Sequence, residues 1–526
     1  MQPFHLLSLP GELLLQIMES LRDSRDIQAL QATALTCKTL HQVAEICLYS
    51  IAEFTTLSSL YQFLDATRTN PNRKGYLRDL SLLYSTPRYN SQESFSLPDL
   101  TVFPNLTSFV SESPECQPLS VKGTRWDLYM DAYLQAFEQA SLLNPVVNTP
   151  RPLQNLRSLT LHWTGAKRRY WSVTPMCPIF LLPQLQSLEI SCAGVGQGAA
   201  VGQEEPSQWP TEELECFRGK TGLRSLIFTE CVVSVEALHL ILSFPRALQR
   251  LDLCETFYHR SYGIGTRFAV DHNDAFNHAI AQQSENLQHL NIFCNRRFSS
   301  DSRQLVLSLS NFPVLSYLQI GPFPKYYFNP LVPSVQYLKF VLDRPVPPVL
   351  SSLRLSDQAI SIQHIPTYRM FSVLPVEDLM KNARARGLPF TFDIVLAPLP
   401  EPPAQAQPTP RLTPQFVRNF VEELANEFQS LQQISTRPRP ALSSELPSLP
   451  DHPNQTSSRL RVLTSKYHHK IPPFLHGERP PRFVARYDSW HPEKFLSNPY
   501  TADTIPSDWD TSSDDEDMDA VFTVRQ

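Results

Sequence analysis

The chain has 526 residues, of which 42% are hydrophobic and 18% charged, with a formal net charge of −5. That length leaves room for roughly two to four domains. The charge gives no bulk attraction to nucleic acid or to an anionic membrane. No apolar run approaches the ~20 residues that span a bilayer, and we expect no secretory signal because the first residues lack a charged start and a small-residue cleavage site.

The nine cysteines are scattered along the chain, and no two of them form a Cys-x-x-Cys pair. Their odd number and irregular spacing indicate reduced thiols, not a disulfide framework or a zinc site. We therefore expect a cytoplasmic or nuclear protein without a metal ion and without a cofactor.

The first fifty residues carry a helical pattern that begins with Leu9-Pro10-Gly11-Glu12-Leu13-Leu14. Pro10 suits the first turn of a helix, and apolar residues then recur at helical spacing as far as Leu21. Two further short helices are predicted, with Asp26 and Thr36 as N-caps. Three helices of this size bury little core by themselves. Their apolar surface is therefore either a docking site or a cap packed on the next domain.

The ordered motif resembles the F-box family. The pattern Leu-Pro-x-Glu-Leu-Leu-x-x-Ile-x-x-x-Leu covers residues 9–21, and Asp26-Ile27-x-x-Leu30 and Thr36-Cys37-Lys38-Thr39-Leu40 continue it. F-box proteins are substrate receptors of cullin–RING ubiquitin ligases, and the F-box docks on a Skp-type adaptor. The resemblance implies an F-box over residues 1–52. The adaptor-binding residues that it implies are Leu9, Pro10, Leu13, Leu14, Ile17, Leu21, Leu30 and Leu40.

From about residue 75 to 357 the pattern Leu-x-x-Leu-x-Leu recurs, with Ile, Val or Phe at some positions. Its copies begin at Leu77, Leu156, Leu185, Leu223, Leu248, Leu287, Leu315, Val335 and Leu350, with a weaker one at Leu106. Alternating apolar and polar residues predict half-buried strands. Stacked copies would form a parallel sheet with a continuous apolar row.

Helical patterns lie between several of these copies, at residues 126–143, 234–244, 271–284 and 302–309. A late helix over 376–386 and a closing strand over 390–395 complete the segment. The pattern resembles degenerate leucine-rich repeats and predicts an irregular solenoid over residues 53–397. An unrelated α/β domain with leucine-rich strands is the alternative.

The polar residues between the inward leucines should point out of the concave sheet, where a protein substrate would bind. They could instead be merely solvated. These candidates are His162, Glu189, Arg250, Asp252, His289, Asn291, Tyr317, Gln319, Tyr337 and Lys339. Arg250, Tyr317 and Tyr337 are the expected anchors because Tyr and Arg are enriched at interface hot spots.

The last quarter of the chain begins with a proline-rich linker over residues 398–412. An amphipathic helix is predicted over 413–434; it would fold back on the solenoid or bind a partner in a groove. Residues 435–526 are rich in Pro, Ser and Arg and are predicted to be mostly disordered. They include the segment 508–519, which holds seven acidic residues.

No catalytic motif is complete. Gly219-Lys220-Thr221 lacks the earlier glycine of a phosphate-binding loop, and Gly194-Val195-Gly196 precedes a proline-containing segment, not a helix. We therefore expect an α/β, non-enzymatic substrate-recognition subunit of an SCF-type ubiquitin ligase. It would bind a Skp-type adaptor and an unidentified protein substrate, and neither nucleic acid nor membrane. The alternative is an adaptor-bound scaffold or regulatory protein with no part in ubiquitylation.

Overall fold

The structure is a computed structural model of the chain, and most of the elements predicted from the sequence fall within the residues that it describes. The described residues are 6–24, 26–83, 98–113, 126–144, 151–163, 171–196, 214–229, 231–255, 273–294, 304–321, 339–342, 344–356, 376–396, 414–436, 458–465 and 483–491.

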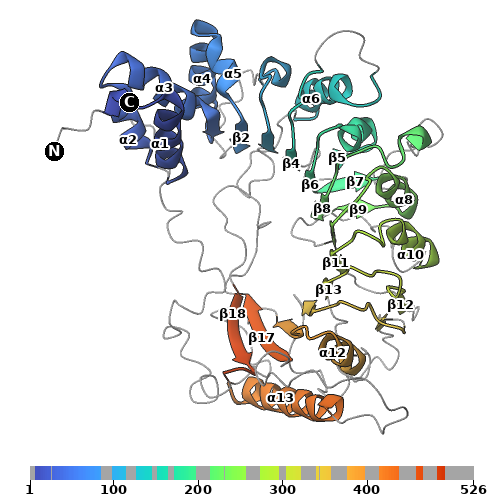
Figure 1. Ribbon diagram of the computed structural model, residues 1–526. Helices are drawn as coiled ribbons and strands as arrows, with labels where there is room; N and C mark the ends of the chain where they lie inside the picture. Colours follow the sequence, from blue (N-terminus) through green and yellow to red (C-terminus); the bar gives the residue numbers. More distant parts are fainter. Residues whose placement is uncertain are drawn as a thin grey trace, which may run out of the picture.

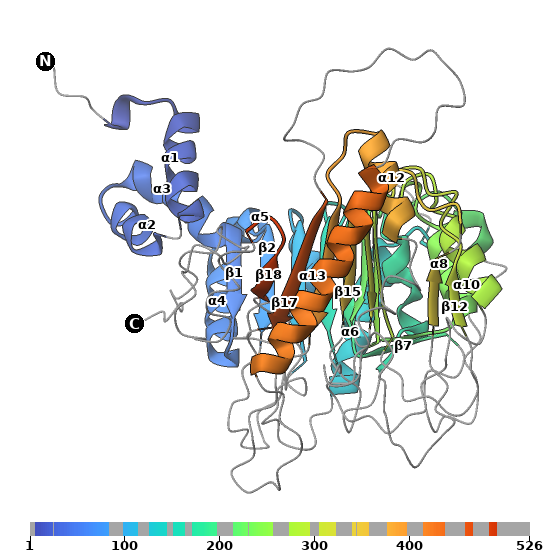
Figure 2. The ribbon, with the colours of Figure 1, turned by 90° about the horizontal axis from the view of Figure 1, so that it is seen from below.

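A small helical unit begins the described chain and lies to one side of the sheet (Figure 2). It contains η1 (Leu6–Ser8), α1 (Gly11–Asp23), α2 (Ile27–Ala34) and α3 (Lys38–Ser50). The Asp26 carboxylate accepts the backbone N–H of Ala29, so it caps α2 as predicted. Pro10 stands at the N-terminal boundary of α1, where its missing N–H costs nothing.

Helix α3 continues directly into the first strand, which joins the unit to the sheet. Arg73 strengthens the junction: its Nε donates to Glu45 Oε1 at 2.8 Å, and its guanidinium lies 4.6 Å from the centre of the Tyr49 ring. Two helices that follow complete this end of the molecule, α4 (Leu57–Thr69) and α5 (Asn72–Tyr76).

Within the described residues, the main sheet has thirteen strands arranged in chain order, all parallel except the last pair. They are β1 (Ile51–Phe54), β2 (Asp79–Leu83), β3 (Ser108–Glu112), β4 (Ser158–His162), β6 (Ser187–Ser191), β8 (Ser225–Thr229), β10 (Arg250–Glu255), β11 (His289–Cys294), β13 (Tyr317–Gly321), β15 (Ser352–Ser356), β16 (Thr391–Leu396), β17 (Arg459–Ser465) and β18 (Phe483–Asp488).

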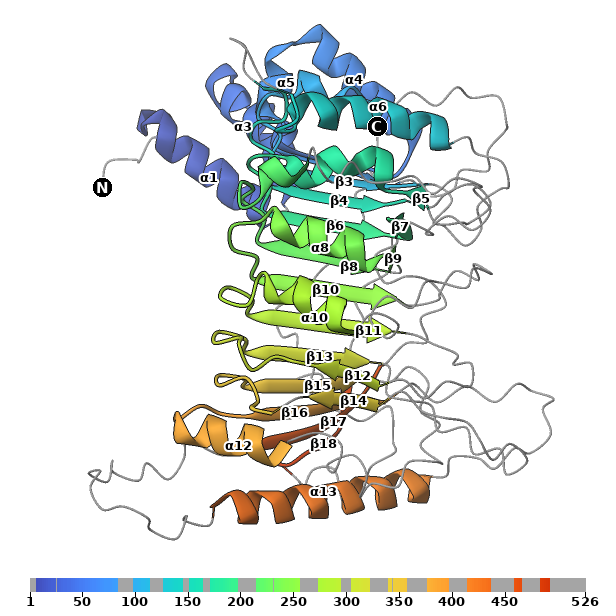
Figure 3. The ribbon, with the colours of Figure 1, turned by 90° about the vertical axis from the view of Figure 1, so that its right-hand side faces the viewer.

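The sheet is curved, and helices lie along its outer side (Figure 1), with the strands stacked as successive rungs (Figure 3). The fold is therefore mixed α/β. The helices labelled along it are α6 (Trp126–Ala140), α8 (Val235–Ser243), α10 (Asn273–Ala281) and α12 (Val376–Ala385), and α13 (Pro414–Thr436) lies at the end of the sheet. The connections also contain the short helical turns η2 (Leu100–Val102), η5 (Thr174–Leu181) and η6 (Glu215–Phe217). A three-stranded sheet adds β5 (Trp171–Ser172), β7 (Ala193–Val195) and β9 (Val232–Val233).

The apolar residues of the recurring pattern form two inward rows across the sheet. Leu226 pairs in register with Leu188 and Leu251, and the row continues strand by strand from Leu80 to Leu460. Both Leu226 and Leu460 are fully buried. In the second inward row, Ser111 takes a position that its neighbour strands fill with leucine, and its Oγ accepts a hydrogen bond from the buried Trp163 indole at 2.9 Å. Trp163 itself is part of the main core.

Two predictions within this region are wrong. Residues 304–307 form a strand, β12 (Gln304–Leu307), where a helix was predicted over 302–309. It pairs with β14 (Lys339–Leu342) in a separate two-stranded sheet, so the pattern copy at Val335 adds no strand to the main sheet. The reason is register: β15 places Leu353 beside Leu318 of β13, which leaves no place for β14 between them.

The closing part of the chain also differs from the prediction. The strand β16, predicted to be the last, is followed in the sheet by β17 and β18, both drawn from the segment predicted to be mostly disordered. The proline-rich composition of the segment predicted disorder. Apolar and polar residues nevertheless alternate along β17, and Leu460 and Val462 are buried in the core. The other residues of 435–526 lie almost entirely outside the described ranges.

Helix α13 confirms the predicted amphipathic helix, and it folds back onto the molecule. It lies against α12 and β17 at the end of the sheet (Figure 2). Val421, Leu424 and Phe428 are buried in the main core, and the Phe428 ring stacks on Phe392 with centres 6.4 Å apart. This helix therefore covers the apolar side of the last parallel strands. The linker over 398–412 lies outside the described residues.

We predict that Leu226→Asp lowers the stability of the whole chain by at least about 3 kcal/mol, because it places an unpaired carboxylate in the apolar row. Ser225→Asp is the matched control, since Ser225 lies one residue away in register with Arg250 on the opposite side of the sheet. Thermal unfolding should show a large fall in midpoint for the first variant only. Equal midpoints for the two variants would contradict the inward assignment of Leu226.

Candidate functional site

The first candidate site is the exposed side of α1. Leu13 and Ile17, one helical turn apart, are 42% and 38% exposed, whereas Leu14 and Met18 are buried. The helix thus presents one apolar stripe to the small core and leaves a second on the surface. Among the other predicted adaptor-binding residues, Pro10 is exposed, and Leu9 and Leu21 are half-buried.

Three residues predicted to bind the adaptor belong instead to the interior of the helical unit. Leu14, Leu30 and Leu40 are 2%, 0% and 7% exposed and pack together with Met18 and Ala44. A side chain so deeply buried cannot contact a partner unless the unit opens. Sequence periodicity shows that a helix is apolar on a given side but does not say which of two adjacent apolar stripes is covered.

The second candidate site is the inner side of the main sheet, opposite the leucine rows. Of the predicted substrate-binding residues, His162 and Asp252 are buried, and Arg250 is exposed. Half-buried members of the set are Glu189, His289, Asn291, Tyr317 and Gln319. Tyr337 lies outside the described residues, and Lys339 belongs to β14 in the separate two-stranded sheet, so it is not part of this side.

At one end of the inner side, His162 lies between two carboxylates. Its Nδ1 is 3.5 Å from Glu112 Oε1, and its Nε2 is 3.5 Å from Glu189 Oε1. Burial alone would lower the pKa of His162, but hydrogen bonding to the two glutamates outweighs it and raises the pKa to about 9. His162 is therefore a buried cation at neutral pH, placed between the buried Glu112 and the half-buried Glu189.

Toward the middle, Asp252 joins two basic side chains. Arg250 Nε lies 3.2 Å from its Oδ2, and His289 Nε2 lies 3.3 Å from its Oδ1. Burial opposes ionisation, but the hydrogen bonds from His289 and Arg250 lower the pKa of this carboxyl. The His289 ring stacks on Tyr317 with centres 4.1 Å apart, and the Tyr317 hydroxyl donates to Gln319 at 2.8 Å. Strand pairing therefore links five of the predicted residues into one polar network.

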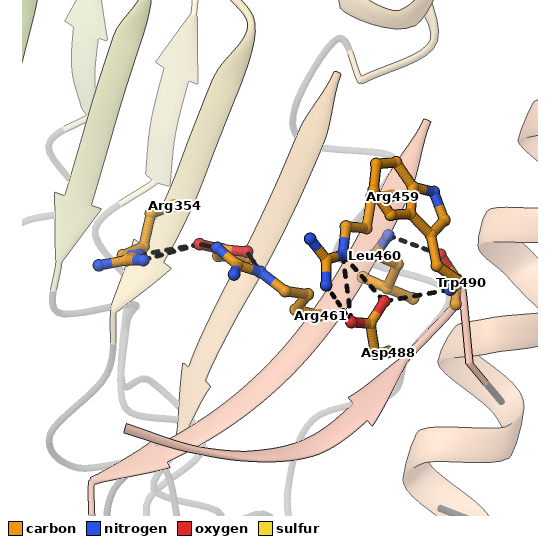
Figure 4. Close-up of polar contacts among 8 residues, drawn as sticks. Arg354, Arg459, Leu460, Arg461, Asp488 and Trp490 are labelled. Carbon is orange, nitrogen blue, oxygen red and sulfur yellow. Dashed lines mark hydrogen bonds and ion pairs between the residues drawn. The ribbon is translucent and has the colours of Figure 1, made fainter. Parts of the chain in front are cut away.

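Figure 4 shows a second arginine–aspartate cluster, which spans β15 to β18. Asp393 has no exposed surface and accepts hydrogen bonds from both Arg354 (2.8 Å) and Arg461 (2.7 Å). Next to it, Arg459 Nε donates to Asp488 Oδ1 at 3.0 Å, and its guanidinium lies 4.5 Å from the centre of the Trp490 ring.

Sequence reasoning missed this cluster. Arg354 lies between Leu353 and Leu355, and Asp393 lies between Phe392 and Ile394, so the alternation that identified the other polar residues also marks these two. Arg459, Arg461 and Asp488 belong to the segment 435–526, whose Pro-, Ser- and Arg-rich composition predicted disorder.

A cleft of about 490 Å³ lies between the helical unit and the first strands. Three arginines, Arg22, Arg78 and Arg157, and two aspartates, Asp23 and Asp79, line it. Within the described ranges no group of three or more His, Cys, Asp or Glu is placed to hold a metal ion. No helix in those ranges has both the length and the apolar character needed to cross a bilayer.

Comparison with protein-family models and with curated proteins finds no match for this chain.

The Glu112–His162–Glu189 group predicts a specific pH dependence. A pKa raised from 6.5 to about 9 on folding means that His162 contributes stability that is complete below pH 6.5 and lost as pH rises toward 9. The difference in denaturant midpoint between the native chain and His162→Gln should therefore shrink between pH 6.5 and 9. Both proteins retain Glu112 and Glu189, so the comparison removes only the imidazole. A difference that is constant across this range would contradict a charged His162.

Proposed function

We propose that this chain is the substrate-recognition subunit of an SCF-type ubiquitin ligase. In this proposal residues 1–52 act as an F-box that binds a Skp-type adaptor, and residues 53–397, read as degenerate leucine-rich repeats, hold a protein substrate. The strands β17 and β18 extend the same sheet. The chain would act by positioning its partner, since the chemistry would belong to other subunits of the ligase.

The observation that carries the proposal is the pair of exposed apolar side chains on α1. Leu13 and Ile17 occupy defining positions of the F-box pattern, and both remain accessible after the small helical core is complete. Exposed leucines and isoleucines at helical spacing are what a partner groove would bury. Leu6 and Leu7, just before α1, are also exposed, at 39% and 55%.

The position of the helical unit also supports the proposal. It has its own small core, separate from the main core, and it is anchored through α3 to the edge strand of the sheet. A partner bound on α1 would therefore be held next to, but not on, the long inner side of the sheet. Tethering of this kind raises the effective concentration of substrate groups near a second bound enzyme.

We predict that Leu13→Ala together with Ile17→Ala weakens binding to a Skp-type adaptor at least ~10-fold, because each buried aliphatic side chain is worth about 1.5–3 kcal/mol. Isothermal titration calorimetry of the full chain with the purified adaptor measures this. Gln16→Ala, an exposed polar change on the same helix, should leave the affinity unchanged. An unaltered affinity in the double variant would remove the F-box assignment.

A second measurement separates a ubiquitin-ligase receptor from an adaptor-bound scaffold. Proteins captured with the native chain and with the Leu13/Ile17 double variant are compared in cells. A cullin should co-purify with the native chain only, and a substrate should accumulate with the variant. Adaptor binding without accumulation of any captured protein would favour a scaffold.

A further inference from the structure

We propose that the inner side of the sheet from β10 to β18 binds an acidic segment of a partner protein. The arginine face, as we term it, consists of Arg250, Arg354, Arg459 and Arg461 together with Tyr317 and Trp490. The ligand it fits is an extended peptide with clustered carboxylates or phosphates. This deepens the proposed function by giving the substrate a chemical class, but the binding itself does not require an adaptor.

Buried aspartates on the same side of the sheet hold the arginines of this face in place. Arg250 is anchored by Asp252, Arg461 by Asp393 and Arg459 by Asp488, in each case through Nε and one terminal nitrogen. A guanidinium has five N–H groups in a fixed plane. Among the described residues, the remaining N–H groups of Arg250, Arg459 and Arg461 donate to no protein acceptor. They are therefore oriented donors with capacity for an external anion.

Burial separates the two signs of charge on this face. Asp252, Asp393 and Asp488 are 4%, 0% and 2% exposed. The side chain of Arg250, in contrast, is 47% exposed, that of Arg459 25% and that of Arg461 17%. A ligand approaching the sheet would meet guanidinium groups before carboxylates. The opposite holds at β4 and β6, where Glu189 is the more exposed partner of the buried His162.

Strand register places these groups in two parallel rows. Arg250, His289, Tyr317 and Arg459 share one row, and Asp252, Arg354, Asp393 and Arg461 share the next. Five strand intervals separate β10 from β17, which at ~4.8 Å each is about 24 Å. An extended peptide rises ~3.3 Å per residue, so about seven residues would span the distance between Arg250 and Arg459.

Two of the arginines, Arg354 and Arg459, lie over aromatic rings. The Arg354 guanidinium lies 5.9 Å from the centre of the Tyr317 ring, and that of Arg459 lies 4.5 Å from the centre of Trp490. Trp490 is itself 44% exposed. Such rings restrict the arginine rotamers, and they offer an apolar surface to the aliphatic parts of a bound peptide. Both effects reduce the entropy lost when a ligand binds.

The test is fluorescence anisotropy of the full chain with labelled ten-residue peptides. Three probes are compared: one rich in Asp and Glu, one with phosphoserines at the same positions, and one with Asn and Gln instead. We expect binding of the first or second probe, weakened by added salt, and at least tenfold weaker binding of the third. Whichever anionic probe binds more tightly identifies carboxylate or phosphate as the preferred group. Equal binding of all three probes would overturn the proposal, and so would binding of neither anionic probe both by the native chain and by the protein whose own acidic segment is neutralised.

Affinity for the anionic probe is then measured with Arg250→Gln and Arg459→Gln, combined in one double variant, to locate the binding site. Each leaves its aspartate with another donor, His289 for Asp252 and the Trp490 backbone N–H for Asp488, so the fold should persist. The double variant should lose at least tenfold in affinity. Arg384→Gln with Arg386→Gln removes the same charge from exposed residues at the end of α12 and should change it less than twofold. Similar losses in both double variants would show that net charge alone is responsible.

The acidic segment 508–519 of the chain itself is a competing anion with seven negative charges. A further protein in which its acidic residues are replaced by Asn and Gln is therefore measured in parallel. Tighter probe binding by that protein supports the arginine face as a site for clustered acids. Absence of binding by both proteins overturns it. Because no adaptor is present, this outcome is independent of the Leu13 and Ile17 experiment, and either proposal can fail alone.

Discussion

The constraint on which the rest of the structure depends is a single strand register. The inward residues Leu226, Leu251 and Leu290 lie side by side, and the same row continues along the main sheet from β2 to β17. A slip of one residue in any strand would turn its leucines to solvent and its polar residues into the core. The apolar row therefore fixes not only the core but also which polar residues lie together on the opposite side. The Arg250–Asp252–His289 network is a consequence of that register.

Each edge strand of a sheet leaves backbone N–H and C=O groups without a strand partner. The two ends of this sheet differ in what lies beside the edge strand. At the start, β1 follows α3 without a loop, so the helical unit stands beside the first edge. At the other end β18 reverses direction and pairs antiparallel with β17, while α13 covers the apolar side of the neighbouring strands. Parallel sheets need cover on their apolar side, and a helix from far along the chain supplies it here. This explains why the core includes Phe428 and Leu460, residues beyond a long proline-rich segment.

Local patterns predicted much of this architecture and failed where the outcome depends on partners distant in sequence. Period-two alternation located the strands with full leucine sets, such as β4 and β10, because each needs only its own side chains to be apolar on one side. The helix predicted over 302–309 became β12 because pairing with β14 decided a short, ambiguous run. Composition misjudged 459–465, where Leu460 and Val462 alternate with two arginines whose aspartate partners lie on β16 and β18.

The difference between local patterns and distant partners also explains what could be predicted about the polar residues. Alternation predicts that His162 and Asp252 point away from the leucine rows, but it cannot predict their burial, which neighbouring strands produce. A buried carboxylate loses its hydration, and replacement of such ion pairs by apolar residues is often neutral or stabilising. Stability alone therefore gives little reason for three buried aspartates beside arginines along one side of a leucine-rich sheet. Their common effect is geometric: each holds a guanidinium at a defined place and orientation on an otherwise regular surface. Orientation of this kind matters most where a rigid sheet meets a ligand with charges at matching spacing, and this is the physical reason to regard the inner side as a binding surface.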